Sequence, residues 1–431
     1  MAATLRWTNW AGNQTSQPRR WLRVESAKEV SEAVGEARDL EARLRVVGSG
    51  HSFTSIAVAN DVLVDISALQ EVGRVDPVSG EVEVGAGISI ADLNAALHKQ
   101  GRALANMGDI AYQTTAGAIS TATHGTGVRL QGLAAQVSAL TVVDGRGEIR
   151  RLSGDDAFRC AQVSLGTMGV ITSVRLKTVP AFVLRAVEQP MVLEEVLEGL
   201  GEHVESNDHF EFFWIPHTKW ALTKRNNRTD GPPEPMPAGK KWFQKSFLEN
   251  TAFGALCRVG RIRPEWIPRL ATALPSTGST TYADHSHLIF VSERRVKFLE
   301  MEYAIPIENC AEALRRVSSM IESRGFRVSF PVEVRFTAAD DIPLSTAFGR
   351  TTAYIAVHMY KGMDHAEYFR AVEEIMRSFG GRPHWGKMHF LGAEDLASCY
   401  SEWDLFQQVR RKFDPEEIFT NDYTARVLGS R

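Results

Sequence analysis

The stretch Val47-Gly48-Ser49-Gly50-His51-Ser52-Phe53 is the first informative motif of this chain. It follows a short apolar run at 44–47 that is typical of a strand, and it combines two glycines with two serines. Such a loop exposes consecutive backbone N–H groups, which together can bind a phosphate. It has neither the Gly-Lys-Ser/Thr ending of a Walker loop nor the third glycine of a dinucleotide-binding fingerprint. Alone, it is equally compatible with a plain glycine turn between two strands.

A second loop of similar character lies farther along the chain. Residues 116–127 read AGAISTATHGTG, with small side chains at nearly every position and recurring Ser or Thr hydroxyls. Small side chains let a backbone approach a ligand closely, and hydroxyls can donate hydrogen bonds to phosphate oxygens. A tight crossing of loops would explain the glycines, but it would not easily explain two such loops in one domain. Residues 104–127 as a whole are poor in helix or strand signals, and a long loop of this kind is usually functional, so we expect a ligand here.

The segments around these loops alternate irregularly between strands and helices. Apolar residues recur every three to four positions on a helix face and every two positions on a strand face. No regular strand–helix–strand order emerges, so the sequence predicts an α+β fold rather than a doubly wound one. The main predicted strands are 44–47, 61–66, 137–143, 148–152, 210–214, 300–305, 332–337 and 352–360, and the main predicted helices are 27–38, 89–100, 309–323 and 364–379.

Length and composition indicate an ordinary two-domain protein. The chain has 431 residues, 44% of them hydrophobic and 23% charged, and its net charge is −3. This net charge gives no electrostatic case for binding nucleic acid or an anionic membrane. No apolar run reaches the ~18 residues of a membrane-spanning helix. The N-terminus lacks the apolar stretch of a secretory signal, so we expect a cytoplasmic protein.

The cysteines and one Pro-rich stretch predict local structure rather than chemistry. Cys160, Cys257, Cys310 and Cys399 are far apart and form no C-x-x-C pair, so the sequence suggests neither a disulfide framework nor a metal site. We interpret them as small hydrophobic residues that are buried. The Pro- and Gly-rich residues 226–241 predict a mobile surface loop.

Three motifs in order, GSGHSF, ATHGTG and RPHWGK, resemble those of the vanillyl-alcohol-oxidase-type flavoproteins. Within that group the chain is similar to the sugar-1,4-lactone oxidases, the family of the L-gulono- and D-arabinono-1,4-lactone oxidases, and close to the alditol oxidases. The resemblance runs from residue 8 almost to the C-terminus and is weakest over 185–295. It implies an FAD-binding domain at 8–183, an α+β substrate or cap domain at 184–395 with an antiparallel sheet over the flavin, and a C-terminal segment at 396–431 that packs back on the FAD-binding domain.

The resemblance also implies which residues contact FAD. His51 matches the position that bonds the flavin 8α carbon in covalent members, and a neutral imidazole is a suitable nucleophile. Gly108 matches a position beside the reactive flavin carbon, where a small residue leaves room for oxygen. The expected cofactor-binding residues are Val47, Gly48, Ser49, Gly50, His51, Ser52, Phe53, Gly108, Asp109, Thr114, Gly117, Ser120, Thr123, His124, Gly125, Gly127, Gly169, Val170 and His384.

Alternating strands in the second half predict a polar face. Glu333 and Arg335 point to the same side of their strand, as do Tyr354, His358 and Tyr360 of another. A single such strand is compatible with a plain surface ion pair, whereas two suggest a sheet that faces a ligand. By resemblance, Glu333, Arg335 and Lys387 are the expected catalytic residues. The expected substrate-binding residues are Asp109, Glu333, Arg335, His358 and Lys387.

The same resemblance implies that the protein oxidises an alcohol. The expected reaction oxidises an aldono-1,4-lactone at the hydroxyl beside the carbonyl, with hydride passing to flavin N5 and electrons to O2 or another acceptor. Lys387 could be the base if a cationic neighbour or burial lowers its pKa, and Glu333 is the alternative base. Arg335 fits best as a fixed donor to substrate oxygens.

Other functions stay open on the sequence. An alditol oxidase acting on xylitol or sorbitol is the nearest alternative, but Asp109 and His358 replace a serine and a threonine that contact substrate in that family. A hydroxy-acid dehydrogenase of the same flavin fold is a broader alternative. A flavin-bearing binding or electron-carrier module without substrate chemistry is the non-enzymatic one. The sequence indicates no oligomeric state.

Overall fold

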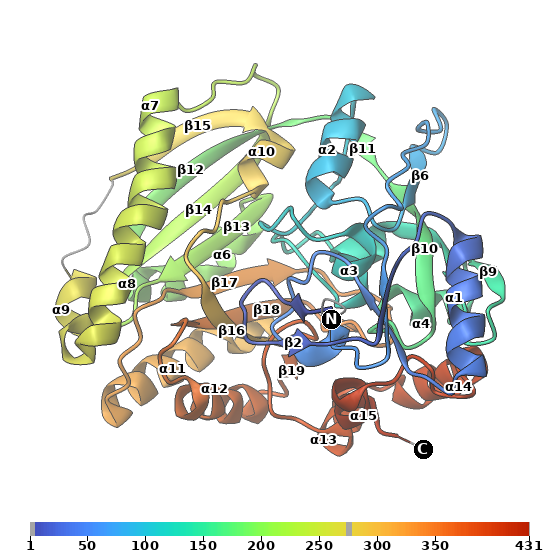
Figure 1. The fold of residues 1–431 in the computed structure, drawn as a ribbon. Coiled ribbons are helices and arrows are strands. Elements are labelled where there is room, and N and C mark those ends of the chain that lie inside the picture. Colours follow the sequence, from blue (N-terminus) through green and yellow to red (C-terminus); the bar gives the residue numbers. More distant parts are fainter. Residues whose placement is uncertain (1–4, 273–277, 431) are drawn as a thin grey trace.

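The computed structural model describes residues 5–272 and 278–430. Its N-terminal part, on the right in Figure 1, is built on a parallel sheet and an antiparallel sheet. The parallel sheet has the order β3 (Arg20–Arg23), β5 (Val62–Asp65) and β4 (Leu44–Val47). The antiparallel sheet has the order β6 (Glu81–Gly85), β10 (Val170–Lys177), β8 (Val137–Val143) and β9 (Ile149–Leu152). The other elements here are α1 (Ala27–Asp39), α2 (Ile90–Lys99), α3 (Thr115–Ser120), α4 (Asp156–Gln162) and the two-residue strands β1 (Trp7–Thr8), β2 (Thr15–Ser16), β7 (Arg102–Ala103) and β11 (Val179–Pro180).

Local sequence explains how β4 and the loop after it are held. Ser26 caps α1 by accepting the N–H of Glu29, and the buried residues of this helix recur at helical spacing. Within β4, Arg45 is 3% exposed. Its guanidinium donates to the backbone carbonyls of Ile56, Leu165 and Phe419. The strand that leads into the glycine loop is therefore tied to three distant segments.

An eight-stranded antiparallel sheet, called the cap sheet below, dominates the second half of the chain. Figure 1 shows α11 (Cys310–Arg324) and α12 (Ala366–Ser378) below this sheet. Val332, Val334 and Phe336 share a hydrophobic core with these helices. The sheet order is β15 (Thr280–His285), β12 (Val183–Val192), β14 (Trp220–Thr229), β13 (His209–Trp214), β17 (Val332–Thr337), β18 (Thr352–Tyr360), β16 (Phe298–Pro306) and β19 (Arg382–Pro383).

The last helices return to the N-terminal part. They are α13 (Ala393–Cys399), α14 (Trp403–Phe413) and α15 (Asp422–Leu428). Phe406 and Phe419 belong to the same hydrophobic core as Val34 and Leu44, so the chain ends on the domain where it began. This two-domain arrangement of helices and antiparallel strands is the α+β fold that the sequence predicts.

One local prediction was wrong. Residues 226–241 do not form a continuous loop, because β14 extends through Thr229 and a helix begins at Ala238. Pairing with β12 and β13 keeps the polar residues 226–229 in a strand. The helix runs through α7 (Ala238–Lys241), a π-helical stretch (Trp242–Ala252) and α8 (Phe253–Ile262). The remaining helices are α5 (Leu193–Glu198), α6 (Leu200–Glu205), α9 (Ile267–Thr272) and α10 (Ser286–Phe290). Among the described residues, no helix is long and apolar enough to cross a membrane.

Candidate active site

The glycine loop after β4 has the backbone geometry of an anion cradle. None of the backbone N–H groups of residues 48–52 donates to an acceptor in the described part of the chain. Gly50 has a φ of +67°, and a Cβ at Gly48 would lie 2.1 Å from Oγ1 of Thr114. Both positions therefore require glycine. Five adjacent free donors fit a phosphate group.

Two cavities meet at this loop. One, with an empty volume of about 820 Å³, runs along residues 47–52 and is also lined by Thr114, Gly117, Ser120 and Gly169. The other, of about 960 Å³, opens toward the cap sheet. Both volumes include open solvent at the mouths. His51 lines both cavities, so a long ligand with a phosphate middle could pass from one to the other beside this side chain.

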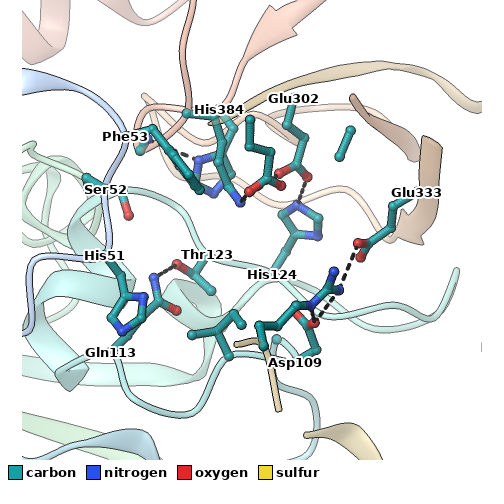
Figure 2. A pocket seen from close by; sticks show the side chains of 18 of the residues that line it. His51, Ser52, Phe53, Asp109, Gln113, Thr123, His124, Glu302, Glu333 and His384 are labelled. Atoms are coloured by element: carbon teal, nitrogen blue, oxygen red, sulfur yellow. Dashed lines mark hydrogen bonds and ion pairs between the residues drawn. The ribbon is translucent and has the colours of Figure 1, made fainter. Parts of the chain in front are cut away.

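The His51 ring is well placed to react with such a ligand. It stacks between the rings of Trp10 and Tyr112, with centroid-to-centroid distances of 5.7 Å and 6.3 Å. It forms no hydrogen bond to a residue of the described chain. Burial, assisted by the charge of Lys387, lowers its pKa to about 4. The imidazole is therefore neutral near pH 7, which leaves a ring nitrogen free to act as a nucleophile. Figure 2 shows His51 and Glu333 on opposite sides of the cavity.

Three neighbouring strands of the cap sheet line the cavity of about 960 Å³, called the wider cavity below, with polar groups. Glu333 and Arg335 come from β17, His358 from β18, and Glu300 and Glu302 from β16. Their register explains the grouping, since Ala356 of β18 lies opposite both Glu333 and Glu302. Alternation along each strand sends the apolar side chains to the helical face instead.

Arg335 is the centre of a buried ion-pair network. Its guanidinium contacts Glu333 at 2.6 Å, Glu211 at 2.8 Å and Asp109 at 3.3 Å. Arg294, from the loop between α10 and β16, contacts Asp109 at 2.7 Å and Glu333 at 3.2 Å. Two guanidinium groups thus bridge three carboxylates, two of which, Asp109 and Glu333, are labelled in Figure 2. Such fixed geometry is typical of arginine, whose planar fork binds two oxygens at once.

The carboxylates of this network differ in proton affinity. Burial alone would raise the pKa of Asp109, but Arg294 and Arg335 hold it well below its usual range. Burial raises the pKa of Glu333 above its ordinary value, because nearby Asp109 opposes the effect of the arginines. Glu333 is therefore the carboxylate of this network that accepts a proton more readily than usual.

A second network surrounds Lys387. Its ammonium pairs with Glu300 and lies 3.8 Å from Glu302. Burial would lower the pKa of Lys387, but these carboxylates outweigh it and raise the pKa. The sequence allowed Lys387 as the base only if its pKa were lowered, and that condition is not met. Lys387 is instead a fixed cation and hydrogen-bond donor.

Two histidines face the same group. His124 contacts Glu302 at 2.6 Å and the carbonyl of Gly125 at 2.9 Å. Burial lowers the pKa of His384 to about 4. Ligand atoms of His124, Glu302 and His384 lie within 4.8 Å of one another, which is close enough for a metal ion. The neighbouring ammonium of Lys387 would repel such an ion, so we interpret the group as part of the organic ligand site.

Most of the predicted site residues line these two cavities. The wider one contains His51, Ser52, Phe53, Gly108, Asp109, Thr123, His124, Glu333, Arg335, His358, His384 and Lys387. Three predicted cofactor residues line neither cavity. A Cβ at Gly125 would lie 2.2 Å from Asn106 Oδ1, Gly127 donates to the Phe336 carbonyl, and Val170 is fully buried in the core.

The sequence reasoning missed four charged residues, namely Glu211, Arg294, Glu300 and Glu302. Glu300 and Glu302 alternate along a predicted strand, just as Glu333 and Arg335 do. That signal was present and could have been used. Arg294 stands in an irregular stretch, ERRVK, where nothing in the pattern distinguishes it from its neighbour Arg295.

Comparison with known proteins gives the family. A model described as "FAD binding domain" matches residues 18–153, and one described as "D-arabinono-1,4-lactone oxidase" matches residues 174–427. The chain belongs to the D-arabinono-1,4-lactone oxidase family. The first match includes both glycine-rich loops, so FAD is the cofactor of this chain.

Several members of this family and of the wider fold are similar over nearly full length. L-gulono-1,4-lactone dehydrogenase of Mycobacterium tuberculosis is 45% identical, with 98% of this chain and 99% of that protein covered. L-gulonolactone oxidase of Bos taurus is 35% identical, with 98% of each chain covered. A solvent-stable cholesterol oxidase superposes with a TM-score of 0.85 at 19% identity, covering 99% of this chain and 98% of that one, which shows a shared fold.

Proposed function

We propose that this protein uses FAD, bonded to His51, to oxidise an aldono-1,4-lactone at the hydroxyl beside the ring carbonyl. The observation that carries the proposal is one cavity with His51 on one side and Glu333, Arg335 and Lys387 on the other. The similar family members, which are named as gulonolactone and arabinonolactone oxidases or dehydrogenases, support the substrate class.

The charges in the cavity favour a neutral substrate. Every arginine and lysine that lines it is already paired: Arg294 with Asp109, Arg335 with Glu333, and Lys387 with Glu300. A hydroxy acid would bring a carboxylate that finds no unpaired cation, and an unpaired buried charge is costly. A lactone carries no charge, and its carbonyl and hydroxyl groups can hydrogen-bond to the paired residues.

Each residue of the cap sheet then has a chemical role. The bound flavin supplies the hydride acceptor. Glu333 takes the proton of the substrate hydroxyl, for which its raised pKa suits it. Arg335 and Lys387 donate hydrogen bonds to substrate oxygens and stabilise the negative charge that develops on the oxygen losing its proton. The networks fix these donors before substrate arrives, so little reorganisation is needed.

Asp109 and His358 differ from the residues expected in an alditol oxidase, and their contacts do not favour that alternative. Asp109 is held by Arg294, Arg335 and Ser292. The His358 ring contacts the Pro331 carbonyl at 3.0 Å and Glu300 at 3.4 Å. Neither side chain is free to replace the serine or threonine hydroxyl expected in an alditol oxidase.

Anaerobic mixing tests this proposal. The purified protein is mixed with L-gulono-1,4-lactone, its open-chain L-gulonate, xylitol or lactate, and the flavin absorbance is followed. We expect bleaching by the lactone and none by the anions. Rapid bleaching by xylitol would transfer the assignment to an alditol oxidase, and bleaching by lactate or L-gulonate would refute the argument from paired cations.

A further inference from the structure

Exposed apolar side chains gather on one segment of the cap. Thirteen large hydrophobic residues are exposed in the described chain, and six of them fall between residues 242 and 266. A short segment therefore holds nearly half of this exposed surface, whereas scattered single residues are the norm. The six are Trp242 (62% exposed), Phe243, Phe247, Val259, Ile262 (72% exposed) and Trp266.

Five of these side chains occupy exposed positions of the helix at 238–262, and Trp266 follows in the short 3-10 helix Pro264–Trp266. Phe247 stacks on Phe243 at 5.7 Å and on Trp242 at 6.0 Å. The inner face is formed by residues spaced three or four apart, including Asn250, Gly254 and Cys257, which are buried. The exposed side of this helix carries large apolar groups where a surface helix normally carries polar ones.

The same segment is strongly basic. Residues 237–272 contain seven lysines and arginines against two glutamates, a net charge of +5, although the whole chain has −3. The rest of the chain therefore carries −8. The expectation of no electrostatic case for an anionic membrane rested on the total charge, which conceals this local excess. Lys240, Lys241, Arg258 and Arg269 are exposed and form no ion pair within the described residues.

The helix at 238–262, called the basic helix below, lies at the outer edge of the molecule. Figure 1 shows α7, α8 and α9 on the side of the cap sheet away from the N-terminal part. The inner face is fixed to the cap, since Asn250 donates to the Glu293 carbonyl and accepts the N–H of Arg295. The outer face has no partner within the described chain that would explain its aromatic residues.

We propose that residues 238–269 form a docking surface for an anionic lipid bilayer. Trp and Phe beside Lys and Arg suit the boundary between headgroups and acyl chains, where the rings are buried and the cations meet anionic headgroups. A symmetric dimer through this face would bring two segments of +5 together, which is unfavourable. This inference does not depend on the proposed lactone oxidation.

Vesicle binding by the full-length, FAD-loaded protein tests the docking surface. We expect the protein to sediment with vesicles of equal parts phosphatidylglycerol and phosphatidylcholine, far less with phosphatidylcholine alone, and less as salt is raised. The double variant Lys240→Glu with Lys241→Glu should weaken binding at least about tenfold, since each basic residue near an anionic surface contributes about fivefold. Trp242→Ser with Ile262→Ser should weaken it without removing the salt dependence.

Matched variants in the N-terminal part are the controls. Lys99→Glu with Lys177→Glu makes the same charge change on exposed lysines elsewhere, and Ile149→Ser removes an apolar residue that is 53% exposed. Both should bind as wild type does. Absence of binding to anionic vesicles at low salt, or equal losses in test and control variants, would overturn the proposal. So would a dimer in solution that Trp242→Ser converts to a monomer, because the face would then bind a second copy.

Discussion

Replacement of Glu333 by Gln tests the assignment of the base. The two side chains are nearly the same size, so the cavity keeps its shape while the carboxylate loses its ability to accept a proton. Arg335 retains Glu211 at 2.8 Å and Asp109 at 3.3 Å, and Arg294 retains Asp109 at 2.7 Å. No buried cation loses its last partner, so we expect the variant to fold and to keep its flavin.

The expected loss of rate follows from the role of Glu333 as the general base. A general base contributes about 10²–10⁴-fold to the rate, which corresponds to ~3–5 kcal/mol of activation free energy. Because burial raises the pKa of Glu333, wild-type kcat/KM should rise with pH through a value above the ordinary 4.5 of a glutamate. The base acts when deprotonated, so activity is lost below that pKa and gained above it. The Gln variant should lack this rise.

Glu211→Gln is the matched control. Glu211 pairs with the same guanidinium of Arg335 and loses the same charge when replaced, but it does not line the cavity. The assay is the rate of anaerobic flavin reduction by the lactone for both variants and wild type. We expect Glu333→Gln to lose about 10²-fold or more, and Glu211→Gln to lose much less. Equal losses would mean that the network charge, rather than proton transfer at Glu333, controls the rate.

Three further variants probe other parts of the site and fold. His51→Ala should release all flavin into the supernatant on acid precipitation, whereas wild-type colour should stay in the pellet; release from both would refute the covalent bond. Gly108→Ala would place a Cβ 3.3 Å from Cγ2 of Thr123 and should slow reoxidation by O2 more than reduction by lactone, as stopped-flow measurement of both steps would show. Burial lowers the pKa of His389 to about 3, so its contribution to stability is present above about pH 6.5 and is lost as pH falls toward 3. His389→Leu should therefore flatten the fall in Tm between pH 7 and pH 5, and an unchanged slope would contradict this.

Much of the fold could be predicted from the sequence because its elements carry simple periodicity. The helix at α1 and the strands β17 and β18 were predicted within a residue or so of their observed bounds. The helix at 238–262 could not be, because its outer face is apolar and its inner face contains glycine and asparagine. Because large apolar residues stand on exposed positions as well as on packed ones such as Phe253, the pattern does not distinguish the buried side from the exposed side.

The site residues likewise fall into those that a local sequence pattern predicts and those that it does not. Residues in the glycine loop and on β17 were predicted because motif and alternation mark them. Arg294 was not, because its role depends on a loop geometry that brings it to Asp109, a residue 185 positions away in the chain. Single-sequence patterns report local periodicity, and a contact of this range depends on the tertiary fold alone.

These two omissions belong to one structural unit. Asn250, on the inner face of the basic helix, is hydrogen-bonded to both neighbours of Arg294, at the Glu293 carbonyl and the Arg295 N–H. The position of the helix therefore fixes the loop that supplies a guanidinium to the active site. If the exposed side of this helix rests on a bilayer, Asn250 links the membrane-bound helix to the loop that carries Arg294 of the ion-pair network. The segment with the least distinctive sequence thus connects the proposed docking surface to the substrate cavity.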